Sequence, residues 1–375
     1  MKTKTILKSI IILIMLMSGL LSCKAESEFA AKPIVKTVGK IDVMVDPNVE
    51  MMMILGRIAG AGPYAGDRKI NEAYVDDVDE YFKDFMYSPA AIRLMRYQLS
   101  YQALPEFGMY LNDDDSDFKL KLNNKNFLIL NRWGTGFITA NDVLYYKDAA
   151  FRETVRAFRK DSDFDRFFLA HQKVYEEMID QTCVYLNKSD FESWYEDFYG
   201  VKLKEHGHIY VTYISGGGNF GVTIRNKNGK AIPNIVVCAG QSEEGFLFLL
   251  SHEFSHPRTN PLLFELGKNE KLITKFNETF KKYSDAYYGN GYGDGYSIMG
   301  EMLNQACANK YLETIFDERT MDWINREEIL GAQKFIYTPQ IADFLDNYLN
   351  NRKRYKTLMD FEPELEKFLE TLELE

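Results

Sequence analysis

The sequence predicts an α+β fold that is mostly helical, with a small sheet placed directly before a helix that carries two histidines. Three observations support this prediction. Apolar residues recur at helical spacing over most of the chain, β-branched and aromatic runs occur within residues 208–238, and a His-Glu-x-x-His segment follows these runs. With 375 residues, of which 46% are hydrophobic, the chain can bury a substantial core.

The charge of the chain excludes one class of partner. The formal net charge is −10, and no long basic run lies beyond the N-terminus. Binding to nucleic acid depends on a basic surface that neutralises phosphates. We therefore expect no nucleic-acid partner.

The N-terminus predicts a secreted chain with a lipid anchor. Three lysines lie within the first eight residues, residues 10–17 are unbroken apolar, and Ser22 precedes Cys23. The apolar run is too short to span a membrane comfortably. The pattern resembles the bacterial lipoprotein processing site, which implies a signal peptide over residues 1–22, and a lipidated cysteine and tether over residues 23–40. It also implies a place in the bacterial cell envelope, facing the periplasm or the cell exterior.

Two lobes are expected beyond the tether, a mainly helical lobe over residues 41–200 and a lobe with the histidine pair over residues 201–375, which together can form one domain. Three cysteines remain in them, Cys183, Cys238 and Cys307, with no Cys-x-x-Cys spacing. This odd number indicates neither a disulfide framework nor a cysteine zinc site. We expect buried free thiols, with a single bridge as the alternative.

Capping residues and prolines separate the predicted elements of the first lobe. Alternation and helical spacing predict one strand and several helices, over residues 41–45, 48–58, 69–104 and 142–199. Asp46 and Pro47 supply an N-cap and a first-turn proline for the first helix, and Pro89 breaks the third range into two helices. His171 lies alone among apolar neighbours, so we expect a structural role for it.

The second lobe begins with strands and continues with helices. The predicted strands cover residues 208–214, 220–224 and 232–238, and the predicted helices cover 243–256, 268–288, 298–316 and most of the remainder. Ser242 is the expected N-cap of the histidine helix, which Pro257 and Pro261 are expected to end. Ser297 is the expected N-cap of the helix that carries Glu301 in its first turn.

The segment 251–256 places His252 and His256 four residues apart, with Glu253 directly after the first histidine. On a helix, the two imidazoles lie on one face, close enough to bind one zinc ion, and Glu253 lies about 100° further round. A catalytic zinc needs three protein ligands and an open position for water. The pattern therefore predicts a Zn²⁺ site in which Glu253, as general base, takes a proton from the zinc water.

This segment resembles the zincin metallopeptidases, whose signature is His-Glu-x-x-His. Because His256 is followed by Pro-Arg-Thr-Asn-Pro and not by an extended Gly-x-x-His, the resemblance is to the gluzincin arrangement. It implies a zincin-like fold and a third ligand from a glutamate on a later helix, which Glu301 matches by position. Gln305 departs from the best-known gluzincin pattern, which has an acid there. The alternative third ligands are Glu265, Glu270, Glu313 and Asp294.

Residues 251–261, with the segment that starts at Val45, also look like an uncharacterised family of bacterial zincin-like lipoproteins. This resemblance covers most of residues 40–310. The zincin resemblance further implies that the strand nearest the active helix holds an extended peptide, with residues 232–238 or the run after His208 as candidates.

An oxyanion donor beside the zinc is also implied, because enzymes of the resembling kind commonly use a tyrosine or a histidine there. Tyr296 and His208 are the candidates. His206 and His208 alternate along one strand face, which leaves a second metal site open beside the simpler interpretation of an exposed strand end.

Together these features predict a membrane-anchored, zinc-dependent metallohydrolase, in the first instance a peptidase that acts on a peptide or protein. The alternative is a catalytically silent lipoprotein that uses the same scaffold to bind peptide or cell-envelope glycan. Endopeptidase, exopeptidase and amidase chemistry share the same ligands and base, so the motif does not separate them.

Overall fold

The structure is a computed structural model, and it describes residues 31–65, 71–97, 102–111, 148–203, 206–216, 218–225 and 231–373. The predicted signal peptide and Cys23 lie outside these residues, as does the start of the helical stretch expected from residue 142. In the described part of the chain, no helix has both the length and the apolar character needed to cross a membrane.

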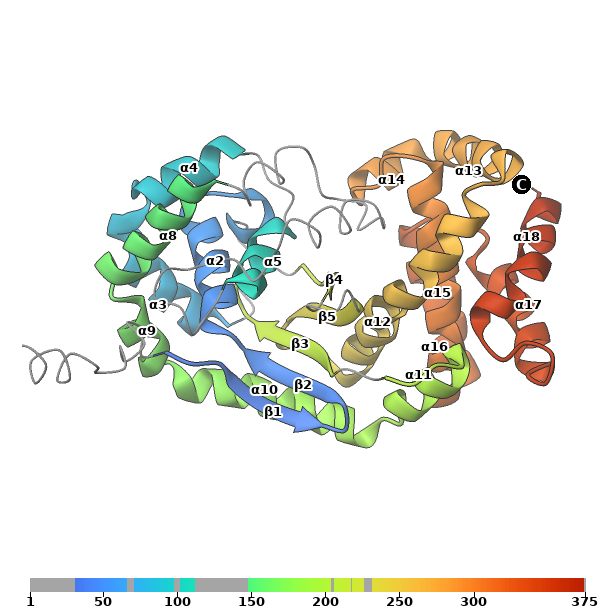
Figure 1. Cartoon of the computed structure of the whole chain (residues 1–375), viewed down its shortest axis with the longest axis horizontal. Coiled ribbons are helices and arrows are strands. Elements are labelled where there is room, and N and C mark those ends of the chain that lie inside the picture. Colours follow the sequence, from blue (N-terminus) through green and yellow to red (C-terminus); the bar gives the residue numbers. More distant parts are fainter. Residues whose placement is uncertain are drawn as a thin grey trace, which may run out of the picture.

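A five-stranded sheet lies in the middle of the molecule (Figure 1). Its strands are β1 (Ile34–Val38), β2 (Ile41–Val45), β3 (Gly207–Thr212), β4 (Phe220–Arg225) and β5 (Ala231–Cys238). The order is β1-β2-β3-β5-β4; β2, β3 and β5 are parallel, and the outer strands β1 and β4 pair antiparallel with their neighbours. The two predicted lobes therefore contribute strands to one sheet.

The first strand lies inside the stretch expected to be a tether, so that prediction is wrong over Ile34–Val38. Four of these five residues are β-branched, which favours an extended backbone. Gly39, at φ 57°, turns the chain directly into β2. The hairpin pairs the backbone of β1 with β2, and the segment is thereby held in the sheet.

Helices surround the sheet and make the molecule mostly helical, as predicted. The helices between β2 and β3 are α2 (Pro47–Ile58), α3 (Glu72–Phe82), α4 (Pro89–Tyr97), α5 (Ala103–Tyr110), α8 (Ala149–Asp161), α9 (Phe164–Ala170), α10 (Gln172–Lys188) and α11 (Phe191–Tyr199). Those after β5 are α12 (Glu243–Leu266), α13 (Glu270–Lys282), α14 (Ser284–Gly289), α15 (Gly295–Ile315), α16 (Glu318–Trp323), a π-helix (Ile324–Ala332), α17 (Thr338–Asn350) and α18 (Glu362–Thr371).

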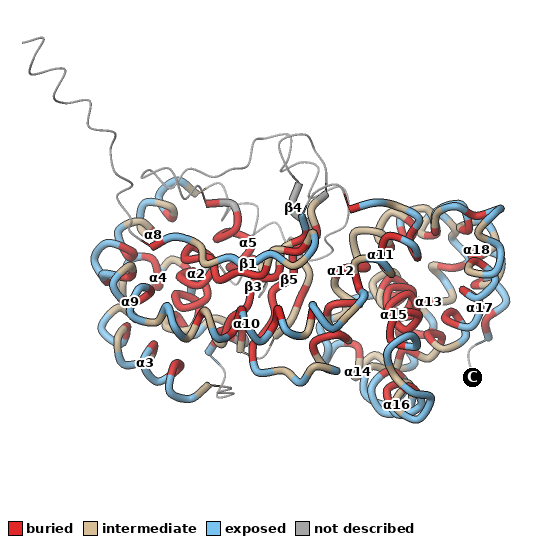
Figure 2. The backbone as a smooth tube through the Cα atoms, turned by 90° about the horizontal axis from the view of Figure 1, so that it is seen from below, coloured by how far each residue is buried: buried red, intermediate tan, exposed pale blue. Residues whose placement is uncertain are grey.

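Two helices are buried along most of their length (Figure 2). They are α2, in the part of the chain before β3, and α15, in the part after β5. The N-cap of α2 is as predicted, since the Asp46 carboxylate accepts from the backbone N–H groups of Asn48 and Val49 at 2.8 and 3.1 Å. In the second half, α12 packs along α15 and against β5 and β4.

The histidine helix α12 is longer than the sequence predicts. It begins after Ser242, whose hydroxyl caps the first turn as expected. It then continues through Pro257 and Pro261, so the prediction that these prolines end it is wrong. Each of the two prolines costs about 3 kcal/mol inside a helix, and the turns beyond His256 bury three leucines at roughly 1.5–3 kcal/mol each, a gain of similar size. The leucines are Leu262, Leu263 and Leu266.

The helix that carries Glu301 begins earlier than predicted. Asp294, and not Ser297, is the N-cap of α15, because its carboxylate accepts from the Ser297 N–H at 2.8 Å in a capping box. Gly295 is needed in the first turn, since an added Cβ would lie 2.3 Å from the backbone nitrogen of Asn277 on α13. Glu301 therefore lies in the second turn of α15, and not in the first.

The three described cysteines are buried free thiols, as expected. His171 lies where α9 meets α10. Its Nδ1 is 2.8 Å from the Phe167 carbonyl oxygen, and its Nε2 is 3.3 Å from a carboxylate oxygen of Asp77. These local bonds fit the structural role expected for this histidine.

A buried carboxylate joins α2 to the end of β3. Glu50 is 1% exposed, and it accepts hydrogen bonds from the hydroxyls of Tyr74 and Thr212 at 2.7 and 2.8 Å. Burial raises the pKa of Glu50 from its ordinary 4.5 to about 7, although both hydrogen bonds act in the opposite direction.

This shift predicts a pH dependence of stability. The folded protein holds the Glu50 proton more tightly than the unfolded chain, so the free energy of unfolding should fall by up to about 3 kcal/mol between pH 4.5 and 7. Glu50→Gln should remove this loss, whereas Glu72→Gln, on the exposed face of α3, should not. Denaturant unfolding at a series of pH values measures the slope, and an unchanged slope in Glu50→Gln would contradict the assignment.

Candidate metal centre

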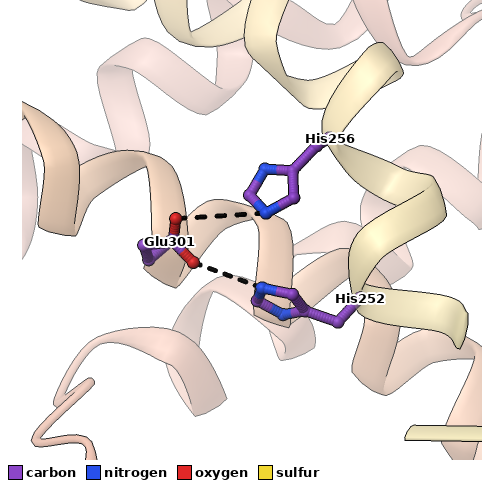
Figure 3. A group of neighbouring side chains, drawn as sticks. All are labelled: His252, His256 and Glu301. Atoms are coloured by element: carbon purple, nitrogen blue, oxygen red, sulfur yellow. Dashed lines mark ion pairs between the residues drawn. The ribbon is translucent and has the colours of Figure 1, made fainter. Parts of the chain in front are cut away.

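Two packed helices bring the central residues together (Figure 3). His252 and His256 lie one turn apart on α12, with ring centroids 5.0 Å apart, and Glu301 points toward both from α15. Helical spacing places the histidines on one face, whereas the meeting with Glu301 depends on how α15 packs. The structure thus joins the three residues that the sequence proposes as zinc ligands.

The distances in this group fit a single metal ion. Nε2 of His252 lies 3.2 Å from Oε2 of Glu301, and Nε2 of His256 lies 3.9 Å from Oε1. All three ligand atoms can be chosen within 4.8 Å of one another. Two ligand atoms of a tetrahedral zinc site are about 3.4 Å apart, so small side-chain adjustments suffice. Two imidazoles and one carboxylate are also a donor set that suits zinc.

The other candidates for the third ligand lie elsewhere. Glu265 and Glu313 form ion pairs with lysines of the same segments, and Asp294 caps α15. Glu270 lies in the first turn of α13. None of them belongs to the metal-competent group found among the described residues.

Glu253 lies at the side of the cluster that faces β4. One of its oxygens, Oε2, is 3.8 Å from Nε2 of His256, and the side chain is 11% exposed. The backbone of β4 passes so close that a Cβ on Gly221 would lie 2.8 Å from the same oxygen. A side chain at this point of the strand would displace the carboxylate of Glu253, which lies against the backbone of β4 beside His256.

A chain of carboxamides holds His252 from behind. Nδ1 of His252 lies 2.8 Å from Oε1 of Gln305, whose Nε2 donates to Oδ1 of Asn309 at 3.0 Å. Asn309 in turn donates to Oδ1 of Asn325 at 2.9 Å. This order of donors and acceptors places a proton on Nδ1 and directs Nε2 toward Glu301. An amide therefore orients the imidazole at the position where the resembling enzymes use an acid.

Asn309 and Asn325 were not identified from the sequence. The signal for Asn309 is its spacing, because Glu301, Gln305 and Asn309 follow one another at four-residue intervals on one face of α15. Asn325 comes from the π-helix and has no such signal. A further amide, Asn304, donates to the His252 carbonyl oxygen at 2.8 Å and so ties α15 to α12.

The chain of amides carries a prediction about metal affinity. Gln305→Leu should weaken zinc binding about 10- to 100-fold, because it removes the acceptor that orients His252. Gln305→Glu keeps an acceptor at this position and should restore most of the affinity. Competition with a chromophoric chelator measures both, and equal zinc affinity in Gln305→Leu and the natural chain would show that the bond to His252 has no orienting role.

The electrostatics of the cluster favour a cation. In the described chain, Glu253 and Glu301 have only histidines as ion-pair partners. Burial disfavours a charged imidazole, but the hydrogen bond to Glu301 and the nearby carboxylates raise the pKa of His252 to about 9. Burial likewise opposes ionisation of Glu301, yet the two imidazoles lower its pKa. The metal-free chain therefore holds a proton that metal binding would displace.

Neither candidate oxyanion donor lies beside the cluster. The ring of Tyr296 lies against Gly267 at the C-terminal end of α12, since an added Cβ there would be 2.6 Å from Cε2 of the tyrosine. His256 is about three helical turns away from that end. Nδ1 of His208 bonds to Oδ1 of Asn234 at 2.8 Å. Both side chains lie on the face of the sheet away from α12, because the preceding residue, Gly207, faces Phe254 of α12. The predictions for Tyr296 and His208 are therefore wrong in their placement.

β5, one of the two strands expected to lie nearest the active helix, packs against α12, but it is not at the edge of the sheet. The sequence favours β5 or β3, but both are interior strands, because each pairs with a neighbour on either side. Among the described strands, β4 forms the edge beside α12, and its Gly221 lies against Glu253. The sequence reveals the strands but not their order, which decides which one forms the edge.

The fold and the cluster define a mostly helical α+β protein with a five-stranded sheet and a His-His-Glu group between two packed helices. The chain belongs to the family described as "Domain of unknown function (DUF4932)", which matches residues 41–368 and so includes both predicted lobes. Comparison with curated proteins and with solved structures gives no match.

Proposed function

We propose that the protein is a zinc-dependent metallohydrolase with a zincin-like site, and that its substrate is a peptide or protein. One observation carries the proposal: Glu301 meets His252 and His256 from a separate helix, with the carboxylate of Glu253 beside them. An ion pair alone would need one imidazole. Two imidazoles around one carboxylate, with a second, partly buried acid close by, match the ligands and base of a hydrolytic zinc site.

The residues of the chain would divide the chemistry as follows. A bound zinc ion lowers the pKa of a water molecule and polarises a carbonyl group. Glu253 would take the proton from the attacking water and pass it to the leaving amine. Gln305 would keep the Nδ1–H of His252 in place, so that the lone pair of Nε2 faces the metal.

The edge strand supports a peptide substrate. β4 lies beside Glu253 and is antiparallel to β5, so an extended peptide can pair with its backbone at the edge of the sheet. Gly221 has no side chain to separate such a peptide from the base. Backbone pairing of this kind holds the chain extended and leaves one carbonyl group near the metal ligands.

The silent binding protein remains the alternative, but it gives no role to Glu253. Keeping a carboxylate only 11% exposed costs desolvation free energy. A catalytic base gives that placement a function, whereas a surface that only binds peptides does not need it. For location, we propose a lipid on Cys23 and a place in the bacterial cell envelope, on the pattern of residues 1–23 alone.

Metal removal tests the proposed function. The zinc-loaded full-length protein should cleave members of a mixed peptide library, a chelator should stop cleavage, and added zinc should restore it. Mass spectrometry of the products also gives the preferred cleavage position. A folded, zinc-loaded chain that binds library peptides without cutting them would support the binding protein instead, and cleavage that persists in chelator would reject the metal mechanism.

A further inference from the structure

A polar row crosses the sheet on the face away from α12. Asp42 on β2, His208 on β3 and Asn234 on β5 are register neighbours, so their side chains point to the same face. Gly207, the residue before His208, faces α12, since an added Cβ would lie 2.5 Å from the ring of Phe254. Side chains alternate along a strand, and this row is therefore separate from the cluster around His252.

Two imidazoles, that of His208 in this row and that of His206 directly before β3, lie against the carboxylate of Asp42. Oδ1 of Asp42 lies 3.1 Å from Nδ1 of His206, and Oδ2 lies 3.8 Å from Nε2 of His208. The two corresponding distances around Glu301 are 3.2 and 3.9 Å. Four of the five histidines of the chain thus form two pairs, and each pair contacts one carboxylate at similar nitrogen–oxygen distances. Among the described residues, however, only the group between α12 and α15 has all three ligand atoms within 4.8 Å of one another.

The ring of His208 is oriented in the same manner as that of His252. Asn234 donates from Nδ2 to the Ile232 carbonyl oxygen at 2.7 Å, which leaves its Oδ1 to accept from Nδ1 of His208 at 2.8 Å. The proton of His208 is thereby placed on Nδ1, and Nε2 faces Asp42 as a ligand atom. The carboxylate is also oriented, since Thr37 on β1 donates to Oδ1 at 2.6 Å.

We propose that Asp42, His206 and His208 form a second site for zinc or a similar divalent transition metal. The side chain of His206 is 49% exposed and lies directly before β3, and it must turn for both imidazoles to reach the same ion. His208 and Asp42 are 26% and 19% exposed, which leaves the site open to solvent. Because one ligand must reorient and water competes, this site is weaker than the one between α12 and α15.

The role of such an ion is structural. Asp42 belongs to β2, whereas His208 belongs to β3 and His206 lies directly before that strand, 164 residues further along the chain than Asp42. A bound metal would therefore cross-link the parallel pair through which the two predicted lobes share a sheet. This role does not depend on the proposed hydrolysis, because no residue is common to the two sites.

Zinc titration of the full-length protein tests this site. Calorimetry with zinc chloride should show a second, weaker binding event in addition to that of the α12 site. The variant His252→Ala/His256→Ala should keep only the weaker event, and zinc should still raise its melting temperature. The further change His206→Ala should weaken that event at least about tenfold and remove the thermal shift.

Single variants of the natural chain provide the controls. His206→Ala alone, at a half-exposed position, should leave the tight event intact and weaken only the second one. His171→Ala is the matched control, because His171 also faces one carboxylate, at 3.3 Å, but has no second imidazole beside it. A natural chain that shows no second event, or a second event that His206→Ala leaves unchanged, would overturn the proposal.

Discussion

Replacement of Glu253 by glutamine is expected to lower peptide hydrolysis by about 10²- to 10⁴-fold while zinc binding is retained. Glu253 does not belong to the group of potential ligands formed by His252, His256 and Glu301. Glutamine has the same size, so it also fits beneath β4, where a Cβ on Gly221 would be only 2.8 Å from the carboxylate. The substitution thus removes a proton acceptor and little else.

The matched control for this variant is Glu265→Gln. Glu265 lies on the same helix, is 40% exposed and pairs with Lys268 near the end of α12. Its replacement should leave both turnover and zinc content unchanged. Steady-state rates with a library-derived peptide, measured beside the zinc content, separate the two effects. Undiminished hydrolysis by Glu253→Gln would show that another group serves as the base.

Removal of the third ligand is the second large effect. Glu301→Ala is expected to weaken zinc binding by more than about 100-fold. This loss exceeds the one expected for Gln305→Leu, which changes a residue that only orients a ligand. Glu301 is 14% exposed and faces both imidazoles, and its carboxylate helps to raise the pKa of His252 to about 9 through a hydrogen bond and its negative charge. The variant therefore loses a ligand together with the charge that draws cations to the site.

Glu313→Ala serves as the control, because Glu313 lies on the same helix and pairs with Lys310 at its far end. Its zinc affinity should match that of the natural chain. Both affinities can be measured by competition with a chromophoric chelator at constant pH, since metal binding displaces a proton. If Glu301→Ala binds zinc as tightly as the natural chain, the ligand assignment is wrong, and loss in Glu313→Ala instead would move it to that residue.

Local signals in the sequence account for much of the fold. The strands, the Asp46 cap of α2 and the Ser242 cap of α12 depend on neighbouring residues, and the structure contains all of them. The same holds for the spacing of His252 and His256, which fixes one helix face. Such features need no knowledge of what packs against them.

Other features depend on packing and were therefore missed. Pro257 and Pro261 locally favour a helix end, but the buried leucines beyond them keep α12 continuous to Leu266. The face on which His208 points follows from its register with Asp42 and Asn234, which one strand alone does not specify. These errors share a cause, since each depends on contacts between segments distant in the chain.

The prediction of Glu301 as third ligand depends on the resemblance to a known arrangement, and not on the residues around it. Nothing in the residues around Glu301 distinguishes it from Glu265 or Glu313, and its position relative to His256 was favoured only by likeness to a known arrangement. The packing of α15 on α12 brings it to the histidines, with Asn304 bonded to the backbone of α12. The amide chain behind His252 ends on the π-helix at Asn325, which no local pattern indicates.

The zinc content of the purified protein tests the central claim most directly. After dialysis against metal-free buffer, which removes the weaker ion, the natural full-length chain should retain about one zinc ion per molecule by elemental analysis. His252→Ala/His256→Ala should retain none while its far-UV circular dichroism is preserved. A folded natural chain that takes up no tightly held zinc, or a double variant that holds as much as the natural chain, would contradict a metal centre between α12 and α15.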